Sequence, residues 1–216
     1  MKKDYKLILF DLDGTLADTS EGIMNCCKQT LLKIGYGEPG EKELKKAVGA
    51  KLIKTFMNVF GLDEKTALEC VVLYRMQYAI QGIFEAVLYE DMKQTLQALK
   101  TKGYKLAVAT LKEERLANML LENLGIADCF EVIHGSNKKD DISKSDIINM
   151  CINDLDAKTE DCVLVGDSMT DLKGAKQSNI DFIAVTYGFG FQSYEEKQMI
   201  NKTLTASKPL QLLDLL

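Results

Sequence analysis

Short apolar runs alternate with helical patterns from residue 88 onward, and this alternation constrains the fold more than any other feature of the sequence. Repeated βα units of this length favour a parallel sheet with helices on both faces. A buried apolar run from Leu7 to Phe10 predicts one more strand near the N-terminus. The other strands are predicted at residues 105–109, 130–133, 162–165 and 182–185, and helices at residues 92–100, 112–124, 143–151, 169–177 and 210–216.

The stretch between the first strand and this alternation carries helical patterns only. Its first helix is capped by Asp18, Thr19 or Ser20 and ends at Gly35. Three more helices follow at residues 41–48, 52–60 and 63–79, and four successive helices form a small bundle. We therefore expect an α/β core domain with a Rossmann-like parallel sheet, formed by residues 1–15 and 86–216, and a four-helix domain formed by residues 16–85.

Two acidic side chains follow directly after the first predicted strand. Asp11 and Asp13 are two residues apart in an extended segment, so both carboxylates point the same way. Gly14 allows a sharp turn, and Thr15 adds a hydroxyl beside them. Two adjacent acids repel one another unless a positive charge separates them, which indicates either a metal ion or two different catalytic roles. The alternative is a strand end followed by an ordinary polar turn.

Polar residues also follow later strands, at the sheet edge where ligands of open parallel sheets bind. Thr110 follows the strand at residues 105–109, and the run GDSMTD places Asp167 and Asp171 after the strand at residues 162–165. Each has a structural alternative, because threonine caps helices and acids stabilise a helix N-terminus. Lys138, Lys139 and Lys144 lie between these strands, and any one of them is more often a solvated surface residue than a ligand contact.

The overall balance of residues excludes several classes of protein. The formal net charge of −5 leaves no basic footprint for nucleic acid, and the apolar runs are too short to span a bilayer. We expect a cytoplasmic protein without nucleic-acid or membrane partners, either a monomer or a homodimer. The six cysteines form no CxxC pair and predict buried free thiols. The single histidine, His134, is expected in a loop at a strand end.

The order DLDGT, helical insert, Thr110, lysine region and GDSMTD resembles the haloacid dehalogenase (HAD) superfamily, in its phosphatase branch close to the phosphoglycolate phosphatases. The resemblance covers nearly the whole chain. It implies that Asp11 is a nucleophile that forms an aspartyl-phosphate, and that Asp13 protonates the leaving oxygen and later activates water. It also implies a Mg²⁺ ion held by the Asp11 carboxylate, the Asp13 backbone carbonyl and Asp167, with Asp171 close by.

The resemblance further implies which groups bind the substrate. Thr110 and Lys144 would bind and neutralise the phosphoryl oxygens, with Lys144 preferred among the lysines by its register with the following helix. Thr15 and Leu111 are also expected to face the substrate. The helical insert resembles a cap that closes over the site and selects the substrate, and its segment VGAKLIKTF places Lys51 near the leaving group.

The sequence therefore predicts a Mg²⁺-dependent phosphatase of a small phosphorylated metabolite, for which the resemblance makes 2-phosphoglycolate the leading candidate. A nucleotidase, a pyrophosphatase and a β-phosphoglucomutase-like phosphotransferase use the same core and stay open as alternatives. A phosphate-binding regulatory protein without catalysis is an alternative of a different class. The intact acids Asp11, Asp13 and Asp167 argue against that last possibility.

Overall fold

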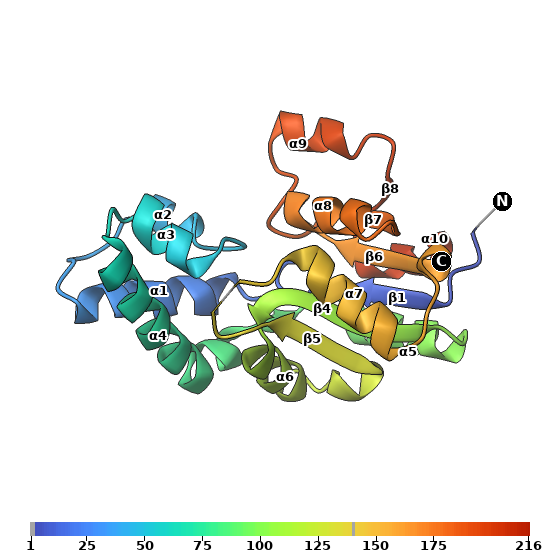
Figure 1. Ribbon diagram of the computed structural model, residues 1–216, viewed down its shortest axis with the longest axis horizontal. Coiled ribbons are helices and arrows are strands. Elements are labelled where there is room, and N and C mark those ends of the chain that lie inside the picture. Colours follow the sequence, from blue (N-terminus) through green and yellow to red (C-terminus); the bar gives the residue numbers. More distant parts are fainter. Residues whose placement is uncertain (1–2, 140) are drawn as a thin grey trace. The chain divides into compact units, whose positions relative to one another are not determined.

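The computed structural model describes residues 3–139 and 141–216 (Figure 1). The chain divides into two compact units, which we call the core unit and the helical unit. The core unit contains the N-terminal segment up to Asp18 together with Leu88–Leu216, and the helical unit is Thr19–Val87. Short strands β2 (Ala17–Asp18) and β3 (Val87–Leu88) pair with each other where the chain passes between the units.

The core unit is built on a parallel sheet, as predicted. Within the described residues the sheet has six strands in the order β5-β4-β1-β6-β7-β8, and each paired neighbour runs parallel. Strand β1 lies centrally because its residues are apolar and fully buried on both faces. The strands are β1 (Leu7–Phe10), β4 (Lys105–Glu113), β5 (Val132–Ser136), β6 (Cys162–Gly166), β7 (Asp181–Val185) and β8 (Leu204–Ala206).

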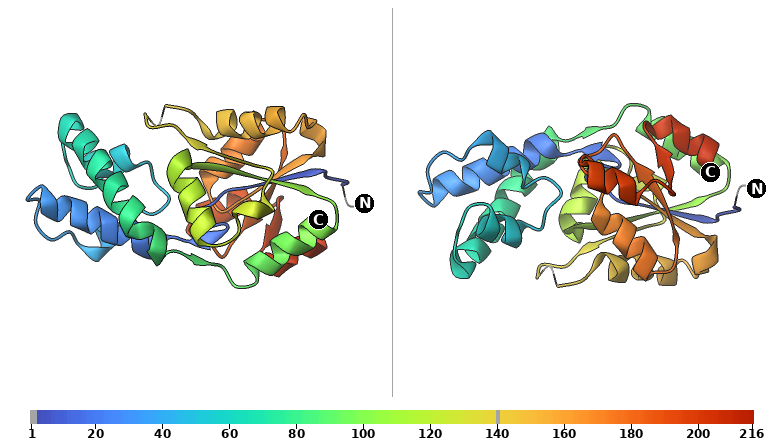
Figure 2. Two further views of the ribbon diagram at one scale, coloured as in Figure 1. Left: turned by 90° about the horizontal axis from the view of Figure 1, so that it is seen from below. Right: turned by 90° about the horizontal axis from the view of Figure 1, so that it is seen from above.

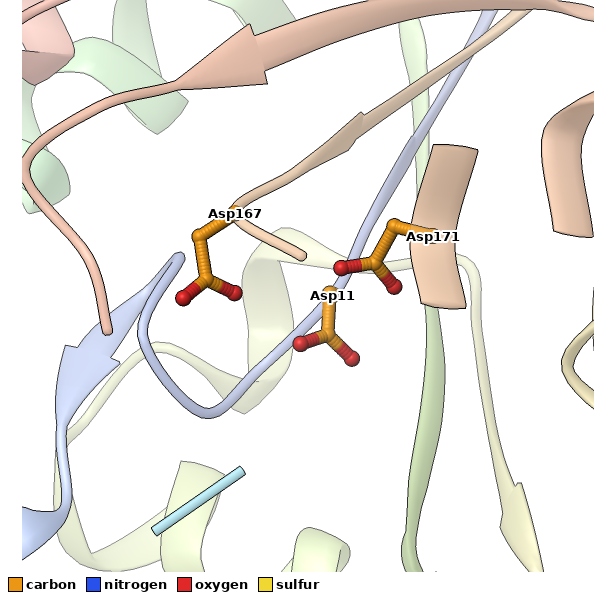
Figure 3. Close-up of side chains that lie close together, drawn as sticks. All are labelled: Asp11, Asp167 and Asp171. Atoms are coloured by element: carbon orange, nitrogen blue, oxygen red, sulfur yellow. The ribbon is translucent and has the colours of Figure 1, made fainter. Parts of the chain in front are cut away.

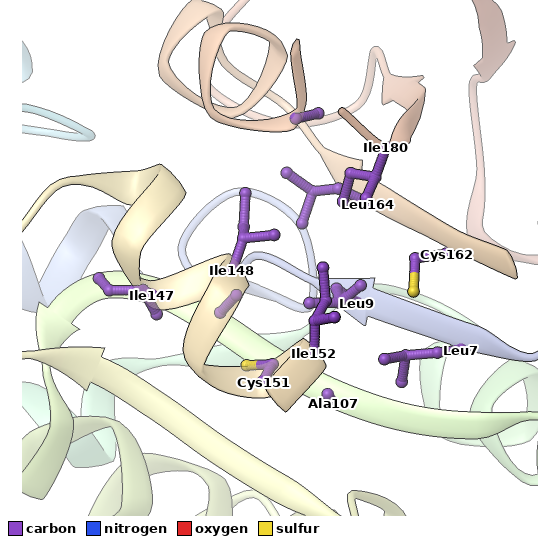
Figure 4. Close-up of a cluster of buried hydrophobic side chains, with 12 residues drawn as sticks. Leu7, Leu9, Ala107, Ile147, Ile148, Cys151, Ile152, Cys162, Leu164 and Ile180 are labelled. Atoms are coloured by element: carbon purple, nitrogen blue, oxygen red, sulfur yellow. The ribbon is translucent and has the colours of Figure 1, made fainter. Parts of the chain in front are cut away.

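Helices cover both faces of this sheet. Figure 2 shows α7 and α8, coloured gold and orange, on one face, with α5 and α10, coloured green and red, on the other. Because strand side chains alternate, Leu7 and Leu9 pack with Ile148 and Cys151 of α7, as Figure 4 shows. The helices of the core unit are α5 (Met92–Thr101), α6 (Glu114–Asn123), α7 (Lys144–Asp154), α8 (Met169–Gln177), α9 (Tyr194–Met199) and α10 (Leu212–Leu215), with 3-10 turns η2 (Ala127–Cys129), η3 (Thr159–Asp161) and η4 (Pro209–Gln211).

The helical unit contains α1 (Ser20–Lys33), α2 (Glu41–Lys45), α3 (Leu52–Asn58), α4 (Glu64–Ile80) and the 3-10 turn η1 (Gly82–Glu85). Asp63 caps α4 by accepting a hydrogen bond from the Thr66 backbone N–H at 3.1 Å. Glycines let α1 approach η1 closely, since a Cβ on Gly22 would lie 2.3 Å from the Gly82 carbonyl oxygen. The predicted succession of helices is therefore confirmed, although α2 is shorter than expected.

Several predicted boundaries were wrong. The strand predicted at residues 105–109 continues to Glu113, where it still pairs with Ser136 after a register shift, so the next helix begins at Glu114 instead of residue 112. His134 lies within β5 and not in a loop, because the strand extends to Ser136. Strand β8 and helix α9 were not predicted, because β8 has only three residues and the sequence of α9 is short and mostly polar. The final helix is only α10, preceded by a 3-10 turn.

Two expectations about the whole chain can be compared with the structure. The cysteines are free thiols, and all but the partly exposed Cys129 are buried, as expected. In the part of the chain that the structure describes, no helix combines the length and apolar character needed to cross a bilayer.

Candidate active site

The predicted acids lie where the sheet order reverses. From β1 the chain continues to β4 and β5 on one side of β1, and it later returns to β6 on the other side. The carboxyl end of β1 is therefore the topological switch point, where open parallel sheets bind ligands. Asp11 directly follows β1, and Asp167 directly follows β6.

Three carboxyl groups converge at this point (Figure 3). Asp11, Asp167 and Asp171 each offer an oxygen, and these oxygens lie within 4.8 Å of one another. All three residues are buried. Burial raises the pKa of Asp11 to about 8, with the neighbouring acids adding to the shift that Lys144 opposes. Burial also raises the pKa of Asp167, to about 6.

The Lys144 ammonium bridges two of these acids. Its Nζ lies 2.6 Å from Asp11 Oδ1 and 2.7 Å from Asp171 Oδ1. Burial acts against the charged form of Lys144, but the attraction of both acids prevails and keeps its pKa above the usual range. The stem reaches the site because α8 carries Gly174, where a Cβ would lie 2.6 Å from Lys144 Cγ.

The structure therefore distinguishes among the three lysines considered from the sequence. Ser143 caps α7 in a capping box, which places Lys144 in the first turn of the helix and directs it to the acids. Lys138 and Lys139 are both exposed.

Asp171 serves a structural purpose as well. Its Oδ2 accepts hydrogen bonds from Ser168 Oγ at 2.6 Å and from the Ser168 backbone N–H at 3.0 Å, which closes the capping box of α8. Its Oδ1 faces Lys144. Asp171 therefore caps α8 through Oδ2 and contacts Lys144 through Oδ1. The capping role expected as an alternative is compatible with a place in the site, because the two oxygens have different partners.

The second acid of DLDGT has a partner that the sequence analysis missed. Lys112 Nζ lies 2.9 Å from Asp13 Oδ1 and 3.0 Å from Oδ2, and both side chains are largely buried. The Asp13 carboxylate is therefore engaged by Lys112 and is not part of the three-acid cluster. The residue pattern carried no signal for this pair, because Lys112 lies on the part of β4 that extends beyond the strand predicted at residues 105–109.

The residues predicted to bind the substrate differ in burial. Thr110 is buried, and its Oγ1 accepts a hydrogen bond from the Lys112 backbone N–H at 3.2 Å. Thr15 is buried, and its Oγ1 donates to Asp167 Oδ1 at 3.4 Å. Leu111 packs partly buried against the core cluster of Figure 4. Lys51 precedes α3 in the helical unit and is exposed.

The backbone donors around Asp167 were not predicted, although the turn at Gly14 was. Gly14 has φ of +83° and passes so close to Asp167 that a Cβ there would lie 2.3 Å from its Oδ2. That same oxygen accepts hydrogen bonds from the backbone N–H groups of Phe189 and Gly190. These donors belong to the loop after β7, whose sequence TYGFG follows a predicted strand and could have been inspected for that reason.

The charges and atoms of the site fit a divalent cation with oxygen ligands. The four carboxylates of Asp11, Asp13, Asp167 and Asp171 meet the two ammonium groups of Lys112 and Lys144, which leaves a net charge of −2 when all are ionised. Carboxylate oxygens are the ligands that Mg²⁺ prefers. Because buried charge without compensation is unfavourable, a bound Mg²⁺ would balance this site.

Comparisons with known proteins agree with this geometry. The family of haloacid dehalogenase-like hydrolases matches residues 8–185. A 5'-nucleotidase of Pseudomonas aeruginosa is 34% identical over 86% of this chain and 85% of its own length. A phosphoglycolate phosphatase of Colwellia psychrerythraea is 29% identical over 88% of both chains. The tyrosine-protein kinase PtkA of Mycobacterium tuberculosis is 35% identical over 89% of this chain and 66% of its own length.

A solved structure shows the same architecture. A haloacid dehalogenase-like hydrolase of Streptococcus pneumoniae superposes with a TM-score of 0.88 at 31% sequence identity, covering 98% of each chain. Together with the family match, this similarity shows that the chain shares its fold with that hydrolase. The chain belongs to the haloacid dehalogenase-like hydrolases, as a phosphatase that cleaves phosphoric monoesters.

Proposed function

We propose that the protein is a Mg²⁺-dependent phosphatase that hydrolyses a small phosphorylated metabolite through an aspartyl-phosphate on Asp11. The observation that carries this proposal is the position of the Asp11 carboxyl. It lies at the switch point of the sheet, in contact with the Lys144 ammonium and within reach of Asp167 and Asp171. A nucleophile for phosphorus needs this combination of a carboxylate and nearby positive charge.

In the first step an Asp11 carboxylate oxygen attacks phosphorus, and the bond between phosphorus and the ester oxygen breaks. Asp13 in its protonated form donates its proton to the leaving oxygen, so the product leaves as a neutral alcohol. The Lys144 ammonium stabilises the negative charge of the phosphoryl oxygens, and Thr110 adds its hydroxyl at the end of the same sheet edge.

In the second step the Asp13 carboxylate removes a proton from water, and this water attacks the phosphorus of the aspartyl-phosphate. The bond between phosphorus and the Asp11 oxygen breaks, which releases inorganic phosphate and restores the Asp11 carboxylate. Lys112 contacts both oxygens of the Asp13 carboxylate and thereby fixes its orientation. Asp13 thus ends the cycle protonated and ready for the next substrate.

Mg²⁺ would be held by the Asp11 and Asp167 carboxylates and the Asp13 backbone carbonyl, with Asp171 beside them. When bound it neutralises phosphoryl charge and orients the phosphate for in-line attack. This assignment rests on the buried oxygen cluster and on its net negative charge. The Asp171 oxygens already have protein partners, Ser168 and Lys144. We therefore place this residue beside the metal ligands and not among them.

For the substrate we propose 2-phosphoglycolate, because the motifs of the chain are those of the phosphoglycolate phosphatase branch and a curated relative carries that name. The 5'-nucleotidase relative makes a nucleoside monophosphate the second candidate. A phosphomutase would differ in its product, since the phosphate would be retained in a sugar bisphosphate.

The test is release of inorganic phosphate from a panel containing 2-phosphoglycolate, nucleoside monophosphates, pyrophosphate and glucose 1-phosphate, with and without Mg²⁺. We expect Asp11→Asn to abolish turnover, and Asp13→Asn to slow both the formation and the hydrolysis of the phosphoenzyme, because Asp13 is the proton donor of the first step and the base of the second. The matched control is Asp63→Asn in the helical unit, because asparagine also caps helices and activity should be unchanged. Hydrolysis that survives in Asp11→Asn would overturn the proposed nucleophile.

A further inference from the structure

We propose that the loop Tyr187–Gly190, which we call the clamp loop, is a positioning element that fixes Asp167 for metal binding. This inference rests on the proposed Mg²⁺ dependence. The clamp loop follows β7 and meets Asp167 from 22 residues further along the chain. The backbone N–H of Phe189 donates to Asp167 Oδ2 at 2.7 Å, and that of Gly190 donates to the same oxygen at 3.0 Å.

These two hydrogen bonds give the two Asp167 carboxylate oxygens different surroundings. Oδ2 is held by two backbone donors, whereas Oδ1 has the Thr15 hydroxyl at 3.4 Å, a long contact. Oδ1 is therefore the oxygen with more capacity left to coordinate a metal ion. Hydrogen bonds that orient a metal-binding carboxylate sharpen the site, and loss of such partners commonly weakens metal affinity by about 10–100-fold.

Glycine is required in the clamp loop because the backbone runs against both segments that carry the acids. A Cβ on Gly188 would lie 2.1 Å from the Gly14 carbonyl oxygen and 2.5 Å from Asp167 Cβ. A Cβ on Gly190 would lie 2.2 Å from the Asp167 carbonyl oxygen. These separations are far shorter than van der Waals contact, so any side chain would push the loop away from Asp167.

Side chains hold the clamp loop at both of its ends. The Tyr187 hydroxyl donates to the Thr15 carbonyl oxygen at 3.0 Å, and its ring packs edge-on against Tyr89 with centroids 4.7 Å apart. Gln192 Nε2 donates to the carbonyl oxygens of Gly188 and Gly190 at 3.0 and 3.1 Å. Both hydrogen bonds go to the backbone of the loop, so the Gln192 side chain acts on Asp167 through that backbone.

The experiment measures the Mg²⁺ dissociation constant of the full chain without substrate, obtained by fitting the rise in melting temperature against Mg²⁺ concentration, and this constant is the half-saturation concentration compared below. The variants are Gly188→Ala, which displaces the loop, and Gln192→Ala, which only loosens it. The matched control is Gln94→Ala, an exposed glutamine on α5. We expect half-saturation to rise at least tenfold in Gly188→Ala and about 2- to 12-fold in Gln192→Ala, as for loss of a hydrogen bond.

The control should match the wild type, and saturating Mg²⁺ should recover most of the stabilisation in Gln192→Ala. If both loop variants melt lower without metal yet keep the wild-type half-saturation, the clamp loop is only structural and the inference is wrong. If Mg²⁺ does not stabilise the wild type, the proposed metal dependence fails, and the inference fails with it. Should Gly188→Ala not fold, Gln192→Ala decides alone, because its substitution lies on the exposed surface.

Discussion

The core unit buries charge, whereas the helical unit leaves apolar side chains exposed. Among the described residues, the buried charged side chains all belong to the core unit, and four of them are Asp11, Lys144, Asp167 and Asp171. The buried polar side chains of the helical unit are uncharged threonines. Buried charge is unfavourable unless it is paired, and in the core unit Lys144 pairs with both Asp11 and Asp171.

The helical unit shows the opposite balance along α4. Its outer face carries apolar side chains at intervals of four residues, each more than half exposed. They are Leu68, Val72, Met76 and Ile80. The comparison predicts that substitutions at the buried charges of the core unit change turnover or metal affinity as well as stability, whereas substitutions in the helical unit change stability or substrate preference and leave the metal site intact.

We expect the largest difference between the two units when the charge of Lys144 is removed. Lys144→Met leaves Asp11 and Asp171 buried without their shared counter-charge. We expect kcat to fall by about 10²–10³-fold, as for loss of one charge-stabilising group, and the free energy of unfolding to fall by about 3–5 kcal/mol.

The control for Lys144→Met is Lys54→Met on α3, where the side chain is exposed and the change should stay within about 0.5 kcal/mol. Steady-state kinetics and urea denaturation at pH 7.5 measure both effects. Equal effects of the two substitutions would remove the contrast between the units.

The next prediction tests whether damage to the helical unit leaves the metal site intact. Phe56 is fully buried in the helical unit and packs near Phe60, with ring centroids 6.2 Å apart. Phe56→Ala should lower the free energy of unfolding by about 3–5 kcal/mol, because it leaves a cavity. Half-saturation by Mg²⁺ should remain at the wild-type value, measured by isothermal titration calorimetry at a temperature well below unfolding. A change of Mg²⁺ affinity as large as that in Gly188→Ala would show that the core unit does not hold the metal independently.

The parts of the molecule that the sequence predicted well are those governed by local pattern. Strand β1 and helix α8 have the predicted bounds, because a continuous apolar run marks β1 and the Ser168 capping box marks the start of α8. Strand β8 escaped prediction because its sequence, LTA, is short and its burial comes only from pairing with β7.

In the site, too, the residues marked by local sequence pattern were predicted, whereas contacts that depend on the tertiary fold were not. Asp11 and Asp167 could be found from their positions after apolar strands. The pairing of Lys112 with Asp13 depends on β4 staying extended beyond residue 109, which the residue pattern did not reveal. The contact of the clamp loop with Asp167 depends on the path of the chain after β7, and no local pattern encodes that path.

Acidification should weaken Mg²⁺ binding to the core unit. In the metal-free protein the pKa of Asp11 is raised to about 8 and that of Asp167 to about 6, mainly by burial. A proton on either carboxyl competes with the cation, so affinity is greatest above pH 8 and falls as pH drops through 8 and again through 6. Between pH 8.5 and 6.5 we expect half-saturation to rise on the order of tenfold. Thermal shift titrations at constant ionic strength measure this, and an affinity that is constant or higher at pH 6.5 would contradict it.

The smallest expected effect belongs to the helical unit and concerns substrate preference. Lys51 is an exposed residue at the start of α3, and its role in substrate binding is a prediction from the segment VGAKLIKTF. Lys51→Ala should raise KM for the preferred anionic substrate by about 1.4- to 5-fold, as for one solvent-accessible charge contact, and leave kcat nearly unchanged. Lys54→Ala, three residues further along the same helix, is the matched control and should alter neither constant. If Lys51→Ala lowers kcat instead, this lysine acts on the reaction itself, and the assignment of chemistry to the core unit alone is wrong.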